Sequence, residues 1–368
     1  MAKLRKYNEP CLCLSLFFMK GRKRILVAPL NWGLGHATRC IPIIRALLLH
    51  DFEVILASDG IALQLLKKEF PDLEALELPS YQIAYAKNAK LFKWKLLKDS
   101  PKALKAIKAE KKAIKVIIET HNITGIISDN RLGLHNKKVP CVFISHQLQV
   151  LSGSTTWLST KMHQKVMQQF DVCWVPDNLG EPNLSGKLGH VDVPELPIKY
   201  IGPLSRFHKK ETIQTTDLLV ILSGPEPQRT FLEEKLFEEL KTFKGNIVFV
   251  KGILEEAQTK SQKGNMTIYN FMTSALLEQT INESTLVLSR SGYTTIMDLA
   301  KLEKKAFFIP TPGQFEQEYL AKRLDTLGMV PSCKQEDFTI SKLEAVVASS
   351  GLKHFDYDVN YKRLFGLF

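Results

Sequence analysis

Short apolar runs alternate with amphipathic stretches along almost the whole chain. In the first half, the runs at 24–30, 53–58, 123–128 and 139–145 predict buried strands, and the stretches 37–50 and 61–70 predict helices. Val-, Ile- and Leu-rich runs separated by helices are typical of a parallel sheet covered on both faces. We therefore expect a Rossmann-like domain at 23–205, preceded by an unstructured extension at 1–22.

A polar linker at 206–216 separates this pattern from a second copy of it. Strands are predicted at 218–222, 246–251, 285–289 and 306–309, and helices at 227–241, 294–301 and 315–326. The second Rossmann-like domain is therefore expected at 217–345, with a tail at 346–368 that packs back on the first. Two doubly wound α/β domains in series form a cleft, and ligands bind at the carboxyl ends of such strands.

A glycine-rich turn at 31–39 follows the first predicted strand. Gly33 and Gly35 match the first two positions of G-x-G-x-x-G, but Thr38 occupies the third, which argues against ordinary dinucleotide binding. The loop still lets a ligand approach the backbone at a helix start. We expect His36, in the first helical turn, to face the cleft, the alternative being a tight turn with a helix-capping histidine.

The second domain has three loops suited to a nucleotide sugar. Ser223 and Gly224 follow its first strand, and hydroxyls and amides at a later strand-to-helix junction suit a diphosphate. Asp298, one turn on, offers two acceptor oxygens to a ribose diol. The candidate donor-binding residues are Arg206, Ser223, Gly224, Phe271, Met272, Arg290, Ser291, Gly292, Thr294, Thr295, Asp298, Gln314, Gln317 and Glu318.

Several of these segments, in order, resemble the MurG-type glycosyltransferases of family 28, which include the N-acetylglucosaminyltransferase of peptidoglycan lipid assembly. The similar segments are Gly33-Leu34-Gly35-His36, Ser145-His146-Gln147, Gly202-Pro203-Leu204-Ser205-Arg206, Ser223-Gly224, Arg290-Ser291-Gly292 with Thr295 and Asp298, and Gln317-Glu318. The resemblance implies the GT-B fold, a UDP-sugar donor and inversion at the anomeric carbon. We expect Gly33, Gly35, Arg39, His146 and Gln147 to form the glycine loop and the acceptor side, with Arg39 standing where the peptidoglycan enzyme has Pro.

The sequence also departs from that pattern. Asp298 replaces a Glu, Glu318 replaces a Gln, and the segment at Ser145 lacks the Glu and Asn of the peptidoglycan enzyme. We therefore expect a UDP-sugar donor and a lipid-linked or cell-envelope glycan acceptor, without assigning the peptidoglycan acceptor itself.

The expected chemistry needs a general base and a stabilised leaving group. His36 is the first candidate base, and Asp129, at the end of a predicted strand, is the second. The D-x-D sequence at 356–358 lies in the tail, so we expect no metal and no cofactor beyond the UDP-sugar as co-substrate. Helix N-termini, hydroxyls and Arg206 would stabilise the diphosphate instead.

Charge is concentrated in one segment. The chain has a formal charge of +12, and residues 87–115 hold eleven Lys against Asp99 and Glu110. A helix predicted from an N-cap at Ser100-Pro101 places Lys102, Lys105, Lys108 and Lys112 on one face, with Phe92 and Trp94 just before it. This favours an anionic membrane surface, the alternative being a solvated helix face. No recognition fold for nucleic acid accompanies the charge.

The six cysteines form no C-x-x-C pair, which argues against a zinc site or a disulfide framework and favours the cytoplasm. Together with the lysine-rich segment, this predicts peripheral attachment to the inner face of the cytoplasmic membrane. Two other functions remain open from sequence. The G-x-G-H-x-x-R pattern from Gly33 to Arg39 also suits a UDP-sugar hydrolase or epimerase of the same fold. A nucleotide-sugar binding protein without catalytic activity is the third.

Overall fold

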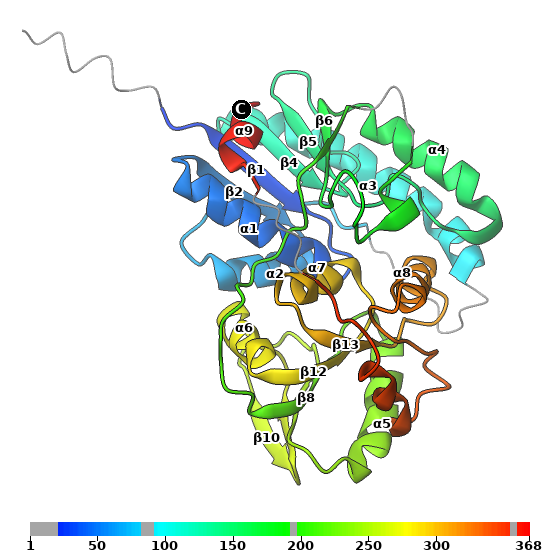
Figure 1. Ribbon diagram of the computed structural model, residues 1–368. Coiled ribbons are helices and arrows are strands. Elements are labelled where there is room, and N and C mark those ends of the chain that lie inside the picture. Colours follow the sequence, from blue (N-terminus) through cyan, green and yellow to red (C-terminus); the bar gives the residue numbers. More distant parts are fainter. Residues whose placement is uncertain (1–20, 82–91, 192–196, 354–358) are drawn as a thin grey trace, which may run out of the picture.

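The computed structural model describes residues 21–81, 92–191, 197–353 and 359–368, with the backbone alone described at 92–101. Two α/β units lie one above the other, each built on its own sheet (Figure 1). Both sheets carry helices on their two faces, as the alternation of apolar runs and amphipathic stretches predicts. The expected GT-B arrangement of two doubly wound domains is confirmed.

The first sheet has the order β3-β2-β1-β4-β5-β6-β7, and every neighbouring pair is parallel. Its strands are β1 (Arg24–Pro29), β2 (Glu53–Ser58), β3 (Ala75–Glu77), β4 (Gly125–Asp129), β5 (Cys141–Ile144), β6 (Val172–Val175) and β7 (Ile198–Tyr200). Successive side chains of a strand point to opposite faces. Ile25 and Val27 accordingly join one apolar cluster and Leu26 and Ala28 another.

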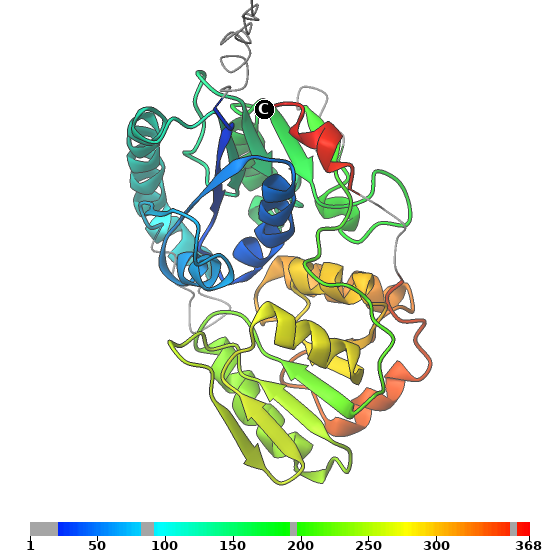
Figure 2. The same ribbon diagram turned by 90° about the vertical axis from the view of Figure 1, so that its left-hand side faces the viewer.

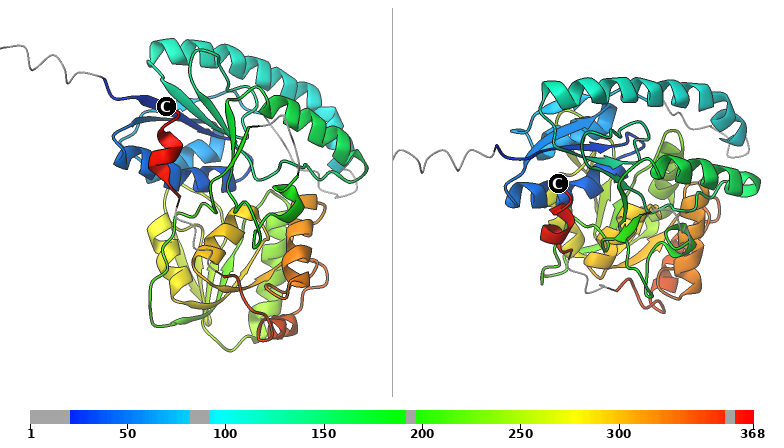
Figure 3. Two further views of the ribbon diagram at one scale, coloured as in Figure 1. Left: turned by 45° about the horizontal axis from the view of Figure 1, so that its top comes forward. Right: turned by 90° about the horizontal axis from the view of Figure 1, so that it is seen from above.

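Helices cover both faces of this sheet. Residues of α1 (Gly35–Leu49) and α2 (Gly60–Glu69) join the cluster of Ile25, whereas α3 (Phe92–Thr120) and α4 (Thr156–Met167) contribute to that of Leu26. Figure 3 shows α3 and α4 along the outer side of this domain.

The long helix α3 corrects one expectation. It begins at Phe92, so Ser100 and Pro101 lie inside it and form no N-terminus. A proline inside a helix removes one backbone hydrogen bond, a cost that the packing of an amphipathic face can offset. The predicted faces are nevertheless present, because Ile114 and Ile118 are buried while the four lysines of the predicted face are exposed.

The second sheet has the order β10-β11-β9-β8-β12-β13, with only the β10–β11 pair antiparallel among the described strands. Its strands are β8 (Thr216–Ile221), β9 (Ile247–Val250), β10 (Lys260–Lys263), β11 (Met266–Tyr269), β12 (Ser284–Ser289) and β13 (Lys305–Phe308). Its helices are α5 (Gln228–Glu239), α6 (Ser274–Asn282), α7 (Tyr293–Lys301) and α8 (Phe315–Thr326). Short 3-10 turns occupy Gly153–Thr155, Gly186–Leu188, Leu240–Thr242 and Ile340–Val346.

The chain crosses between the domains twice. The segment after β7 leads down to β8, and the last residues return to the first domain, where α9 (Tyr361–Phe365) lies on the upper unit (Figure 2). Phe365 lies 5.6 Å, ring centroid to centroid, from Phe52, and Phe368 lies 6.4 Å from Trp174. Residues from both domains share one buried apolar cluster, so the contact between them is continuous with the core.

This topology fixes where a site can form. In each sheet the strand order reverses beside the first strand, between β1 and β4 in the first and between β8 and β12 in the second. Ligands of doubly wound sheets bind at such points, beyond the carboxyl ends of the strands. His36 follows β1 and Asp129 ends β4, while Ser223 follows β8 and Ser291 follows β12. Both sets of sequence candidates therefore lie at topological switch points.

Candidate functional site

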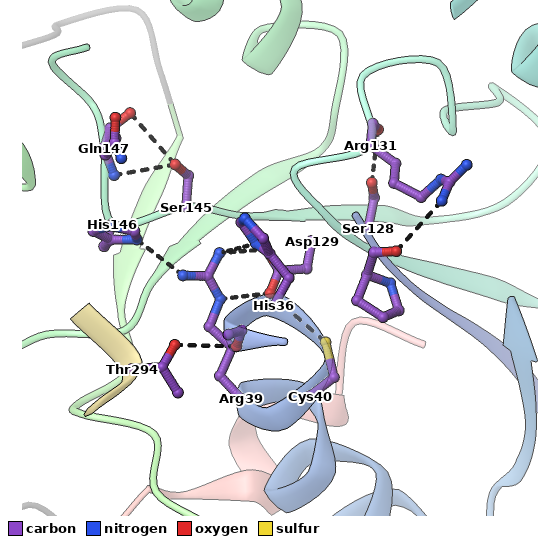
Figure 4. Close-up of polar contacts among 12 residues, drawn as sticks. His36, Arg39, Cys40, Ser128, Asp129, Arg131, Ser145, His146, Gln147 and Thr294 are labelled. Atoms are coloured by element: carbon purple, nitrogen blue, oxygen red, sulfur yellow. Dashed lines mark hydrogen bonds and ion pairs between the residues drawn. The ribbon is translucent and has the colours of Figure 1, made fainter. Parts of the chain in front are cut away.

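A histidine, an arginine and an aspartate meet at the switch point of the first sheet (Figure 4). His36 Nδ1 lies 2.8 Å from Asp129 Oδ1. Arg39, one turn further along α1, binds both oxygens of the same carboxylate through its Nε and one terminal nitrogen. Asp129 and Arg39 are buried, whereas the His36 side chain is 15% exposed.

The charges at this point determine where the protons lie. Burial opposes ionisation of Asp129, but the charges of Arg39 and His36 and the bonds from both lower its pKa to about 2. His36 Nδ1 lies 2.8 Å from this carboxylate, which only accepts, and 2.9 Å from an Arg39 terminal nitrogen, which only donates. Because that nitrogen already donates to Asp129, we assign the Nδ1 proton of His36 to its bond with the carboxylate. The other nitrogen, Nε2, then carries the lone pair. Asp129 is consequently a poor base and a good positioning group for His36, which separates the two candidate bases.

A second histidine extends this network toward the other domain. One terminal nitrogen of Arg39 lies 2.9 Å from His146 Nδ1, and His146 Nε2 lies 2.8 Å from Glu316 Oε1 at the start of α8. Gln147 also donates to the Glu316 carboxylate. The His146 ring stacks on Tyr293 of α7, with centroids 4.2 Å apart and planes 5° apart. Neither Glu316 nor Tyr293 was among the sequence candidates.

The N-terminus of α7 faces the first glycine loop. Thr294 Oγ1 donates to the carbonyl oxygen of Gly35 at 3.0 Å, and a Cβ at Gly35 would lie only 3.2 Å from that hydroxyl. The helix begins after Gly292 without a side-chain cap and without an acidic residue in its first turn. Gly292, Thr294 and Thr295 are half-buried. Backbone N–H groups at an uncapped helix start suit a phosphate group.

Asp298 lies one turn into α7, against the interdomain linker. Its Oδ1 accepts a bond from Ser205 Oγ at 2.7 Å, and burial raises the pKa of its carboxyl to about 6. The nearby Arg206 guanidinium is desolvated, and burial lowers its pKa. Its Nε has no hydrogen-bond partner among the described residues. The Arg206 side chain is thus incompletely paired for its degree of burial.

Two residues of the predicted donor loop have structural roles instead. Arg290 is fully buried and donates to the carbonyl oxygens of Ile309, Pro310 and Gln228, and burial lowers its pKa to about 9. The hydroxyl of buried Ser291 donates to Gln317 O at 2.8 Å. The polar groups of both side chains are directed into the protein and hold the loop, while donor binding at this loop stays a prediction.

The loop between β13 and α8 is held by the predicted sugar-reading residues. Gln317 Oε1 accepts a bond from the Thr311 amide at 2.9 Å, and Glu318 Oε1 accepts one from the Gly313 amide at 2.8 Å. Gln314 is the N-cap residue of α8. Thr311, which the sequence analysis missed, has a buried hydroxyl without a described partner, and it lies 3.6 Å from where a Cβ of Gly224 would be.

The remaining donor candidates line neighbouring loops. Gly224 is exposed with a φ of +102°, a conformation that favours glycine, and Ser223 beside it is half-buried. Phe271 and Met272 follow β11 and are 8% and 9% exposed. The ammonium group of Lys68, from α2 of the first domain, lies 5.5 Å from the Phe271 ring.

A cavity of about 460 Å³ opens on the linker side of the domain contact, away from the donor loops. Arg45, Arg206 and Lys301 are its cationic lining residues. Its lining includes Arg206 but none of the residues from Ser223 to Gly224 or from Ser291 to Asp298. It therefore borders the Asp298 region without being the nucleotide site.

The lysines of the predicted membrane patch, Lys102, Lys105, Lys108 and Lys112, are exposed on α3, while the side chains of Phe92 and Trp94 lie outside the described part. The structure adds three exposed apolar side chains on α4. Trp157 is 68%, Leu158 52% and Met162 61% exposed, and the Lys161 ammonium lies 4.6 Å from the Trp157 ring.

The described residues hold neither a membrane-spanning helix nor a cluster of metal ligands. None of the described helices is both long and apolar enough to cross a bilayer. No cluster of three or more metal-ligating side chains occurs in the described ranges, and the D-x-D segment at 356–358 lies outside them.

With this geometry in place, comparison with known proteins shows what the second domain is similar to. Residues 227–356 match the Glycosyltransferase family 28 C-terminal domain. This range contains α7, α8 and the donor candidates other than Arg206, Ser223 and Gly224. The chain is a glycosyltransferase, and its second domain is similar to the family 28 C-terminal domain.

Relatives of this glycosyltransferase cover different shares of it. It is 26% identical over 212 residues to the UDP-N-acetylglucosamine–N-acetylmuramyl-(pentapeptide) pyrophosphoryl-undecaprenol N-acetylglucosamine transferase of Haemophilus ducreyi, an alignment that spans 56% of each chain. It is 23% identical over 335 residues to an uncharacterized glycosyltransferase of Methanopyrus kandleri, covering 86% of this chain and 91% of that one. The chain thus spans little more than half the length of the first relative.

Solved structures share the fold. The crystal structure of Acinetobacter baumannii MurG matches with a TM-score of 0.53 at 13% identity, covering 94% of this glycosyltransferase and 98% of that chain. UGT2 of Phytolacca americana, complexed with UDP-2fluoro-glucose and pterostilbene, matches with a TM-score of 0.59 at 13% identity, covering 94% and 93%. At these identities the likeness establishes the GT-B fold alone.

Proposed function

We propose that this glycosyltransferase moves a hexose or N-acetylhexosamine from a UDP-sugar to a hydroxyl of a lipid-linked or cell-envelope glycan, with inversion and without a metal ion. The observation that carries the proposal is the bond between Thr294 and Gly35. It places the His36–Asp129 pair of the first domain beside the uncapped start of α7 in the second. A base and a phosphate-binding helix end thus face each other across the domain contact.

His36 acts as the general base in this scheme. Its Nε2 takes the proton of the acceptor hydroxyl while that oxygen attacks the anomeric carbon. The bond from the anomeric carbon to the diphosphate oxygen breaks, and UDP leaves with the electron pair. Asp129 holds the Nδ1 proton and stabilises the imidazolium that forms, because its carboxylate is ionised at 2.8 Å from Nδ1. Attack from the side opposite the leaving group inverts the anomeric carbon.

The chain's own groups stabilise the leaving diphosphate. The α7 N-terminus provides backbone N–H groups and the positive end of the helix dipole, and Thr294 and Thr295 add hydroxyls. Arg206 supplies a cation near Asp298. The Asp298 carboxylate accepts bonds from the ribose hydroxyls. Helix ends, hydroxyls and an arginine thereby replace a divalent ion.

The proposed substrate class rests on what the relatives are named for. The Haemophilus ducreyi relative is named for a UDP-N-acetylglucosamine donor and an undecaprenol-linked acceptor. A UDP-sugar and a lipid-linked acceptor are therefore the substrate class we propose here. His146 and Gln147 stand where an acceptor segment is expected, and both contact Glu316.

A water-soluble donor and a lipid-linked acceptor must meet at one site, so we propose peripheral attachment to an anionic membrane on the cytoplasmic side. Four exposed lysines on α3 supply charge, and Trp157, Leu158 and Met162 on α4 supply apolar contact. Both helices lie on the same outer side of the first domain (Figure 3). Basic side chains beside exposed aromatic and aliphatic ones suit a headgroup boundary.

The test is product analysis with purified protein, a panel of UDP-sugars, and a bacterial lipid extract as the acceptor source. We expect UDP release and a labelled lipid product only when donor and extract are both present. Equal UDP release without the extract would instead establish a hydrolase. Conversion of the donor sugar without UDP release would establish an epimerase, and tight binding without turnover of any donor would leave a binding protein.

A further inference from the structure

Glu316 lies at the end of an unbroken chain of charged and hydrogen-bonded groups that crosses the domain contact. His36 and Arg39 bind Asp129, Arg39 lies 2.9 Å from His146 Nδ1, and His146 Nε2 lies 2.8 Å from Glu316. The first four residues belong to the first domain and Glu316 to the second. Figure 4 shows His146, Arg39, His36 and Asp129 in sequence along this chain.

The hydrogen-bond partners of His146 indicate which of its ring nitrogens carries the proton. The Arg39 guanidinium is only a donor, so His146 Nδ1 must be an acceptor without a proton. A neutral imidazole then carries its proton on Nε2, which points at the Glu316 carboxylate. Burial lowers the pKa of His146, which favours this neutral form. The stack of the His146 ring on Tyr293 further limits its orientation.

We propose that Glu316 is a positioning residue that the donor-side domain supplies to the base. By accepting the Nε2 proton of His146, it keeps Nδ1 open to Arg39 and so holds the Arg39 fork on Asp129. Without Glu316, a proton on Nδ1 would oppose the Arg39 donor, and the fork that orients Asp129 and His36 would loosen. The pair at His36 is therefore complete only while the two domains are in contact. This inference rests on the proposed function.

Glu316 also binds Gln147, so the effect of its charge can be tested separately from the effect of its two acceptor oxygens. The carboxylate has two oxygens, one for His146 and one for Gln147. Glu316→Gln keeps one acceptor oxygen and loses the charge, whereas Glu316→Ala loses both acceptors. A matched control is Tyr319→Phe on the same helix. The Tyr319 hydroxyl accepts a bond from the Lys187 amide across the domains at 2.9 Å, away from His146.

The experiment has an activity arm and an arm independent of activity. With the best UDP-sugar and the lipid extract, we expect Glu316→Ala to lower kcat about 10- to 100-fold, with the donor KM within twofold of wild type and a smaller loss for Glu316→Gln. Tyr319→Phe should keep its kcat. In ¹⁵N NMR of the ligand-free protein, His146 should be the Nε2–H form in wild type and Tyr319→Phe, and a mixture of forms in Glu316→Ala.

Each result decides the inference. An equal loss of kcat in Tyr319→Phe and Glu316→Ala would mean that Glu316 only joins the domains, and a change confined to KM would place it in donor binding. An unchanged His146 spectrum in folded Glu316→Ala would overturn the inference whatever the activity. If wild type transferred no sugar at all, the proposed function would fail, while the spectrum would still show whether Glu316 sets the His146 proton.

Discussion

The Nδ1 atom of His36 lies 2.8 Å from Oδ1 of Asp129, and this contact assigns different roles to two side chains that look equivalent in the sequence. The carboxylate has a pKa of about 2 and is bound by Arg39, so it does not take up a proton near neutral pH. In the proposed mechanism, the other imidazole nitrogen takes the proton of the acceptor hydroxyl.

Replacing His36 should remove the base and leave the donor site intact. We expect His36→Ala to lower kcat about 10²- to 10⁴-fold, the usual contribution of a positioned base. Initial rates with saturating donor would measure this, and calorimetry with UDP should give wild-type affinity. His50→Ala, at the far end of α1, is the matched control. A more severe loss in Asp129→Ala, with normal folding, would instead make Asp129 the base.

Replacing Asp129 should affect stability in a pH-dependent way. Its pKa is lowered in the folded protein, so its ionised form stabilises the fold above about pH 4, and this contribution is lost as the pH falls toward 2. Asp129→Asn leaves Arg39 buried without its counter-charge, which costs roughly 3–5 kcal/mol at pH 7. Urea unfolding should show the difference from wild type shrinking between pH 4 and pH 2. A difference that is constant with pH would rule out this account.

Asp298 should show opposite effects on binding and stability. Asp298→Ala should weaken UDP binding by about 1–3 kcal/mol, because charge-assisted bonds to the ribose are lost. Burial raises the pKa of this carboxyl to about 6, so its ionised form opposes folding at pH 7.5 and this cost disappears as the pH falls below its unfolded value near 4. Asp298→Asn should therefore raise the free energy of unfolding at pH 7.5, by about 1–3 kcal/mol.

Calorimetry and urea unfolding would measure the two effects, with Glu234→Ala, an exposed carboxylate on α5, as the control. Unchanged UDP affinity in Asp298→Ala would remove this residue from the donor site. A destabilised Asp298→Asn would mean that its ionised form stabilises the fold.

Sugar transfer should continue in excess chelator. Helix N–H groups, hydroxyls and Arg206 are expected to balance the charge of the leaving diphosphate. Rates measured with and without EDTA, in protein freed of metal beforehand, should agree within a factor of about two, a margin small against the loss of an electrostatic catalyst. Abolished activity that returns with manganese would refute metal independence.

Membrane attachment should depend on α3 and α4 and on salt. Each lysine near an anionic leaflet contributes about 1 kcal/mol. Changing Lys102, Lys105, Lys108 and Lys112 to Gln should therefore abolish co-sedimentation with anionic vesicles at low salt, and high salt should do the same to wild type. Changing Trp157, Leu158 and Met162 to Ser should also reduce this co-sedimentation.

The control for membrane attachment changes four exposed lysines of the second domain, Lys241, Lys244, Lys260 and Lys263. Equal binding to neutral vesicles would contradict the proposal.

The sequence determined the fold class and the places where ligands can bind. The helix predicted at 315–326 and the strand at 53–58 have the bounds seen in the structure, since each is a strongly patterned segment between clear turn signals. The glycine loops after β1 and β8 and the junction before α7 lie at the switch points, as their positions after apolar runs predict. Segments with a weaker pattern were not predicted correctly. The polar strand β10 and the helix α4, with its exposed apolar residues, were missed, and α3 begins before the predicted start at Pro101.

Only the tertiary structure decided what the individual side chains do. The pattern around Arg290 is the same whether its guanidinium faces a ligand or the protein interior, and the packing of three carbonyl groups around it directs it inward. The roles of His36 and Asp129 depend on Arg39, which lies 90 residues from Asp129 in the chain. Glu316 lies 170 residues from His146, and they meet because the domains close against each other. Local patterns carry information about neighbours along the chain, whereas protonation and hydrogen bonding depend on groups that only folding brings together.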